Sequence, residues 1–155
     1  MKRIVLILVV FLSGFSMVSA QNNPFDKYMD MKGVDVVYIS ESMLSMAGKF
    51  DTDELGIGEI AGKIKSVIIM STERGDLISQ ISKDVNSLLA KDVYERLMFM
   101  KEDDSRIGFY IKRTKDAKTA SEVLMVTEEE DEISVIRLTG DMSIEDIKSI
   151  ARDKM

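Results

Sequence analysis

The chain has 155 residues, of which 21 are basic and 27 are acidic, and it contains no histidine, cysteine or tryptophan. The absence of histidine and cysteine excludes Ser-His-Asp and Cys-His catalysis, His/Cys zinc sites, and haem ligation through either residue. The acidic balance argues against nucleic-acid binding, which requires a clustered positive surface. Neither GxGxxG nor GxxxxGK(S/T) occurs, so nucleotide binding has no support and we expect no cofactor.

The start of the chain has the pattern of a cleaved signal peptide. Lys2 and Arg3 form a short basic segment, residues 4–15 form an apolar run, and small residues lead to Ala20. The run is too short to span a bilayer, and we expect cleavage before Gln21. Cleavage leaves 19 basic and 27 acidic residues, a net charge of −8. Without a cysteine for lipid attachment, the mature chain is predicted to have no stable membrane anchor and to be periplasmic or secreted.

The predicted domain organisation has three parts: a signal peptide over residues 1–20, a linker with a short helix over 21–33, and one domain over 34–155. Pro24 lies in the linker, and apolar residues follow it at helical spacing until Gly33. A chain of this size buries about two thirds of its unfolded surface, which provides a core without disulfides.

The first half of the domain alternates strands and helices. Apolar residues on both faces over 34–39 predict a central strand. Ser40 is expected to cap the next helix, whose predicted buried stripe comprises Met43, Leu44 and Ala47. A weak helix is expected over 57–64 and a second strand over 66–71. The long helix after Gly75 has the clearest apolar stripe, formed by Leu77, Ile78, Ile81, Val85, Leu88 and Leu89.

Residues 94–139 are predicted to form four consecutive antiparallel strands. Their connections are polar stretches at 102–105, 112–119 and 128–131, which predicts an up-and-down meander. The predicted core face of the meander comprises Leu97, Phe99, Ile107, Phe109, Ile111, Leu124, Val126, Ile136 and Leu138.

A capping box of Ser143 and Asp146 is expected to begin a final amphipathic helix. The order is then strand, helix, strand, helix, four strands, helix. It predicts an α+β domain with a largely antiparallel sheet, a C-terminal four-strand meander and helices packed mainly on one face.

The opposite face of the meander is also apolar. The residues predicted to lie side by side there, called the interaction face, are Met98, Met100, Tyr110, Met125 and Val135. An exposed apolar patch of this kind indicates a partner surface or self-association, and methionine side chains adapt to varied shapes. If helices cover both faces of the sheet, these residues belong to the core instead.

Consecutive turns of a meander lie at alternate ends of the sheet, so its acidic connections are expected to meet at one end. This acidic rim comprises Glu102, Asp103, Asp104, Glu128, Glu129, Glu130 and Asp131. The basic residues of the remaining connection are expected at the opposite end; they are Lys112, Arg113, Lys115 and Lys118. The rim suits a divalent cation or a basic partner, or consists of solvated turns that discourage aggregation.

Three weaker patterns point to chemistry. The stretch 51–56 begins like a calcium loop, but Leu55 occupies the fifth position and no glutamate follows at the twelfth. Lys83 lies near Ser79 and Ser82 on a helix flank, where such residues are usually solvated. Isolated acids such as Glu95 or Glu122 have no visible acid partner in a cleft. We therefore predict no catalytic or metal residue.

Three segments carry a family resemblance: 37–44 (VYISESML), 66–69 (SVII) and 136–147 (IRLTGDMSIEDI). With them the chain resembles an exported bacterial family catalogued as domain of unknown function 4252, over nearly the whole mature chain. The resemblance implies a small signal-peptide-bearing protein of Gram-negative bacteria of the Bacteroides type, without catalytic residues. It also implies a role in an envelope response, beside extracytoplasmic sigma-factor systems.

Two functions from different classes remain open. The first is an exported, non-enzymatic module that binds another protein in the cell envelope, which the missing histidine and cysteine favour. The second is a carrier or enzyme for a small ligand or calcium that uses the acidic rim. A pocket lined by converging acids with raised pKa values would favour the second.

Overall fold

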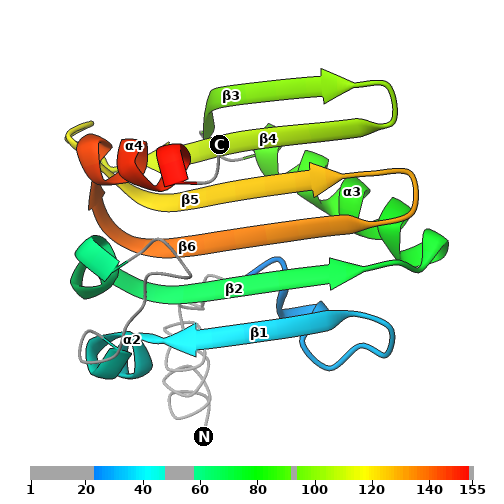
Figure 1. Cartoon of the computed structure of the whole chain (residues 1–155), viewed down its shortest axis with the longest axis horizontal. Coiled ribbons are helices and arrows are strands. Elements are labelled where there is room, and N and C mark those ends of the chain that lie inside the picture. The colour runs from blue at the N-terminus through cyan, green and yellow to red at the C-terminus, as the bar shows by residue number, and fades with distance from the viewer. Residues whose placement is uncertain (1–22, 48–57, 92–93, 154–155) are drawn as a thin grey trace, which may run out of the picture.

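The computed structural model describes residues 23–47, 58–91 and 94–153. In this part of the chain, one antiparallel sheet has the strand order β1-β2-β6-β5-β4-β3 (Figure 1). The strands are β1 (Asp35–Ser40), β2 (Ile64–Thr72), β3 (Tyr94–Glu102), β4 (Ser105–Arg113), β5 (Thr119–Glu128) and β6 (Ile133–Ser143). The helices are η1 (Asp26–Tyr28), α2 (Glu41–Ala47), η3 (Gly58–Lys63), α3 (Gly75–Lys91) and α4 (Ile144–Asp153). The α+β class and the meander β3-β4-β5-β6 are confirmed. The predicted signal peptide and the calcium-like stretch 51–56 lie outside the described residues.

Helices cover both faces of the sheet, which corrects the prediction that they pack mainly on one. Figure 1 shows α3 behind the strands and α2 and α4 in front of them. Successive residues of a strand point to opposite faces. On the face that α3 covers, called the α3 face, the buried cluster comprises Phe25, Tyr28, Ile68, Met70, Ile78, Ile81, Val85, Leu124, Val126, Ile133 and Val135. On the other face, called the α4 face, it comprises Leu44, Ile60, Ile64, Val67, Phe109, Ile111, Ala120, Val123, Leu138, Met142 and Ile147. Strands such as β2 and β5 are apolar at successive positions, so both of their faces need cover.

The cover of the α3 face is one amphipathic helix. The buried residues of α3 are Leu77, Ile78, Ile81 and Val85, which confirms its predicted stripe. The short η1 helix packs beside it, where the Tyr28 hydroxyl and the Lys27 ammonium both donate to the Asp84 carboxylate. Burial and the hydrogen bond to Asp84 raise the pKa of Tyr28. Burial alone would raise the pKa of Asp84, but the bonds from Lys27 and Tyr28 hold it below its ordinary value.

The cover of the α4 face consists of shorter pieces. The Ser40 hydroxyl accepts from the Met43 amide at 3.3 Å, which confirms the predicted cap of α2. Leu44 is buried, but Met43 is 56% exposed, so the buried stripe predicted for this seven-residue helix is wrong at Met43. The capping box of α4 is also confirmed: the Ser143 amide donates to Asp146 at 2.7 Å, and the Asp146 amide donates to the Ser143 hydroxyl at 3.2 Å.

Strand β1 lies at an edge of the sheet, so the prediction of a central strand is wrong. Its one partner is β2, whose other side pairs with β6. Val37 and Tyr38 are consequently 52% and 55% exposed, one on each face. An apolar pattern on both faces therefore did not identify the strand's place in the sheet.

The register of the meander also differs from the predicted core face. Phe109 and Ile111 lie opposite Met125 and Val123. Leu124 and Val126, which were expected beside them, point to the α3 face. Irregularities between Lys112 and Arg113, and between Ala120 and Glu122, determine this pairing. A shift of one residue moves a whole strand's side chains to the other face.

Candidate functional site

An apolar row crosses the α4 face from edge to edge. The strand registers place six residues directly opposite one another in turn: Val37, Ile69, Ile136, Met125, Phe109 and Met98. We call this set the apolar row. Phe109 is 4% exposed and Val37 is 52% exposed, while the other four are half-buried. Every strand of the sheet therefore contributes one apolar side chain to a continuous stripe.

The apolar row marks where the helical cover of the α4 face ends. Two residues along the strands toward α2 and α4, the neighbouring row contains the buried residues Val67, Leu138 and Val123. Two residues along the strands in the opposite direction, away from α2 and α4, Ile107 is half-buried and Met100 is 42% exposed. In Figure 1 no helix of the described chain lies in front of this end of the sheet. We call the apolar row, with Ile107 and Met100, the open half of the α4 face.

The predicted interaction face is divided between the two faces of the sheet. Met98, Met100 and Met125 belong to the α4 face, whereas Tyr110 and Val135 pack against the cluster under α3. The regular pairing from the β3–β4 turn puts Met100 opposite Ile107 and Met98 opposite Phe109, so Tyr110, the next residue of β4, points to the other face. The prediction that all five lie side by side is therefore wrong, because the observed strand register differs by one residue from the one it assumed.

The acidic turns do come together at one end of the sheet. Glu102, Asp103, Asp104, Glu129, Glu130 and Asp131 line a shallow hollow of about 310 Å³ together with Ser105. Glu128 instead accepts hydrogen bonds from the Ser82 hydroxyl on the α3 face, at 3.3 and 3.2 Å. Within the described ranges, no group of three or more acidic side chains is arranged to hold a metal ion. The acidic rim is a concentration of negative charge at the edge of the open half.

The basic residues of the β4–β5 connection lie at the opposite end, as the meander predicts. Arg113 forms an ion pair with Glu95 at 2.5 Å and donates to the Ala117 carbonyl at 3.2 Å. The Lys112 ammonium lies 5.7 Å from the centre of the Tyr94 ring. Part of this positive charge is therefore already engaged within the domain.

A buried ion pair lies on the α3 face. Glu122 is 6% exposed and accepts from Arg137 at two 2.8 Å bonds and from the Tyr94 hydroxyl at 2.5 Å. Burial alone would lower the pKa of Arg137, but the Glu122 carboxylate holds it above its ordinary value. No buried side-chain polar atom among the described residues lacks a hydrogen-bond partner. This arrangement satisfies its own charges, as a structural ion pair does.

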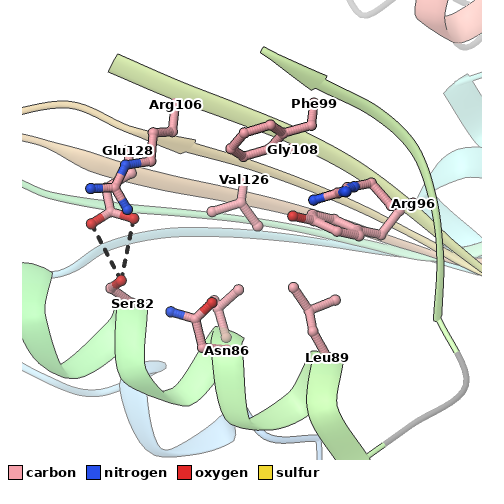
Figure 2. A pocket seen from close by; sticks show the side chains of 11 residues that line it. Ser82, Asn86, Leu89, Arg96, Phe99, Arg106, Gly108, Val126 and Glu128 are labelled. Atoms are coloured by element: carbon pink, nitrogen blue, oxygen red, sulfur yellow. Dashed lines mark hydrogen bonds between the residues drawn. The ribbon is translucent and has the colours of Figure 1, made fainter. Parts of the chain in front are cut away.

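A cavity of about 270 Å³ lies between α3 and strands β3, β4 and β5. Its polar lining comprises Ser82, Asn86, Arg96, Arg106, Tyr110 and Glu128, and its apolar lining comprises Val85, Leu89, Phe99 and Val126, with Gly108 beside them. Figure 2 shows Asn86 and Leu89 extending from α3 toward the strand residues, with Arg106 next to Glu128 at one end and Arg96 at the other.

Sequence reasoning missed this cavity. One local feature could have drawn attention to it: Gly108 is an isolated glycine within β4, a position that often marks a close approach. A Cβ atom there would lie 2.5 Å from the Tyr110 ring. The glycine therefore lets the tyrosine ring lie across its own strand.

The other weak patterns have structural partners. The Ser79 hydroxyl donates to the Gly75 carbonyl at 3.2 Å, and Ser82 binds Glu128, so neither is directed at the exposed Lys83. Glu95 and Glu122 each pair with an arginine. In the described part of the chain, no helix is both long and apolar enough to cross a membrane.

Comparison with known proteins identifies a family but no activity. No curated protein and no solved structure matches the chain. A family model with the description "Domain of unknown function (DUF4252)" matches residues 28–150. This range begins at Tyr28 in η1 and ends within α4, so it includes the whole sheet and all of α3. The chain belongs to this family, the domain of unknown function 4252.

Proposed function

We propose that this protein is an exported, non-enzymatic module that binds a partner protein through the open half of the α4 face. The observation that carries the proposal is the apolar row, which crosses all the strands at the point where helical cover stops. Phe109 is buried and four members of the row are half-buried, while Val37 and Met100 are exposed. Together they form a continuous, partly exposed apolar surface, and such surfaces mark interaction sites. The row contains two methionines, whose side chains adapt to the shape of a partner.

The chemistry around the open half indicates what kind of partner it takes. Glu102 of the acidic rim lies two residues after Met100 on β3, and Glu129 of the rim directly follows β5. A partner that places apolar side chains on the row would therefore bring its flanking residues close to these carboxylates. We propose a basic amphipathic segment, most simply a helix with an apolar stripe bordered by lysine or arginine, because opposite charges guide and orient such complexes.

A photo-crosslinking experiment tests this proposal. Benzoylphenylalanine replaces Ser134, which is half-buried on β6 beside the apolar row, and the purified protein is added to envelope extracts. Crosslinked peptides identified by mass spectrometry should be apolar with flanking lysine or arginine, and their yield should fall as salt rises. Replacement of Ser87, which is exposed on α3, is the matched control and should give no such peptides.

Two variants test whether crosslinking at Ser134 depends on the apolar surface. Val37→Asp and Met100→Asp each place a charge on an exposed position of the open half and should abolish the crosslinks while the protein stays folded. Crosslinks to acidic peptides, equal yields from both positions, or no crosslinks at Ser134 would each contradict the proposal. Crosslinks to this same chain, with dimers in sedimentation, would show that a second copy occupies the surface.

Export is a separate part of the proposal. The basic start, apolar run and small residues up to Ala20 support signal-peptide cleavage. The mature protein should begin at Gln21, which mass spectrometry of the periplasmic or secreted fraction can determine. Intact Met1 in that fraction would contradict cleavage. An envelope-response role further requires that the partner be a component of the envelope.

A further inference from the structure

The cavity under α3 has the composition of a small-ligand site and lies on the opposite side of the sheet from the open half. Its volume of about 270 Å³ falls just below the range of sites for drug-sized ligands. It therefore suits a smaller molecule. The binding of such a molecule goes beyond the proposed protein-binding function and does not depend on it.

Two guanidinium groups, those of Arg96 and Arg106, line the cavity. No ion pair within the described chain involves Arg96 or Arg106, although Arg74, Arg113 and Arg137 each have one. Arg96 lies with its Cζ atom 5.2 Å from the centre of the Phe99 ring. This stacking holds the flat face of the guanidinium, so its N–H edges remain available for a planar acceptor such as a carboxylate.

The two ends of the cavity differ in charge. Arg106 lies directly opposite Glu128 in the β4–β5 register, and Glu128 also accepts hydrogen bonds from Ser82. This carboxylate offsets part of the positive charge at the Arg106 end. Among the described lining residues, none at the Arg96 end is acidic, so this end is the more favourable place for an anion (Figure 2).

The walls between these ends suit an apolar ligand body. Val85, Leu89 and Val126 come from α3 and β5, and Phe99 comes from β3. Gly108 keeps the strand floor free of a Cβ atom, which would meet the Tyr110 ring. A ligand between helix and strands would thus contact apolar side chains along its length and polar groups at its ends.

We propose that the cavity binds a small organic carboxylate with an apolar or aromatic body, its carboxylate paired with Arg96. Phosphate alone would leave the apolar walls without a partner, and a cation would meet two guanidinium groups. Asn86 lines the same cavity from the helix side and offers an amide to the polar part of a ligand.

Nuclear magnetic resonance titration with 4-phenylbutyrate tests the proposal. The amide resonances of Asn86, Gly108 and Val126 should shift in a saturable manner, whereas those of Val37 and Ile69 on the α4 face should not. The neutral 4-phenylbutanamide and the cationic 4-phenylbutylamine have the same body and should bind more weakly. Arg96→Gln should weaken 4-phenylbutyrate binding about tenfold or more, as expected when a charge-assisted hydrogen bond is lost.

Two further variants make the result specific. Lys101→Gln removes the same charge from β3 at a residue outside the cavity lining and should leave binding unchanged. Asn86→Trp at an exposed helix position should fill the cavity and abolish binding. No saturable shifts at millimolar 4-phenylbutyrate, equal binding of the amide, or an unaffected Arg96→Gln variant would overturn the proposal. None of these outcomes bears on crosslinking at Ser134, so the two proposals fail independently.

Discussion

The two faces of the sheet are covered in different ways. The α3 face has one helix of 17 residues with four buried positions, and the η1 segment lies beside it. The α4 face has a seven-residue and a ten-residue helix and a 3-10 turn, which leave the open half uncovered. The long helix buries a continuous core and leaves a cavity at its β3 side, whereas the short helices cover only one end of the α4 face and leave apolar side chains beyond them, where we propose that a partner binds. Four predictions test this contrast.

The buried ion pair on the α3 face should give the largest effect. Glu122→Ala leaves Arg137 buried without its acid and should lower the free energy of unfolding by about 3–5 kcal/mol, measured by urea denaturation. Replacing both residues, as Glu122→Leu with Arg137→Met, should recover most of this loss. The exposed pair provides the control: Glu95→Ala should cost less than about 1 kcal/mol. Equal losses from Glu122→Ala and Glu95→Ala would contradict the assigned role of burial.

Two neighbouring residues of β5 compare the faces directly. Leu124 is fully buried on the α3 face, and Met125 is half-buried in the apolar row. Leu124→Ala should lower the free energy of unfolding by about 2–5 kcal/mol, and Met125→Ala by about 1 kcal/mol. If thermal and urea denaturation give the same loss for both variants, the open half is as well packed as the α3 face.

The attachment of α4 should depend on its cap and on pH. Asp146→Ala removes the carboxylate that accepts from the Ser143 amide and from Lys63, keeps the bond from the residue 146 amide to the Ser143 hydroxyl, and should cost about 1 kcal/mol at pH 7. Hydrogen bonds from Ser143 and Lys63 hold the pKa of Asp146 below its ordinary value. The stabilisation is therefore complete above about pH 4 and is lost as pH falls through the lowered pKa.

Urea denaturation at several pH values measures this dependence. The difference in unfolding free energy between wild type and Asp146→Ala should be present at pH 7 and disappear toward pH 2. Asp76→Ala, at the exposed start of α3, is the control and should change stability less. A difference that persists unchanged at low pH would show that the Asp146 carboxylate is not responsible.

The smallest effect is expected at the edge strand. Val37→Asp on the open half should change the free energy of unfolding by no more than about 0.5 kcal/mol. Val36→Asp, one residue earlier, places the charge against the cluster under α3 and should cost clearly more. Thermal denaturation compares the stability of the two variants. A large loss of stability in Val37→Asp would mean that the open half is covered in solution.

The sequence predicted the elements and some of their ends. The apolar stripe of α3, the cap of α2, the capping box of α4 and the meander are all present. Because consecutive turns of a meander lie at alternate ends of the sheet, the sequence also predicted that the two acidic turns lie at the same end, where they line one hollow. These features depend on residues within a few positions of one another or on strand order alone, so local periodicity and cap chemistry were sufficient.

Which residues come together in the open half and in the cavity could be determined only from the tertiary structure. Bulges near Leu97, Arg113 and Ser121 decide which face each side chain occupies, and no local pattern revealed them. The bulge near Leu97 puts Arg96 opposite Tyr110 and hence in the cavity under α3, whereas the register from the β3–β4 turn pairs Met98 with Phe109 and so separates it from Tyr110. The pairing of β2 with β6 likewise leaves β1 at the edge. Because side chains alternate with every residue along a strand, a single extra residue exchanges core for surface. Only the pairing of distant strands determines where that residue falls.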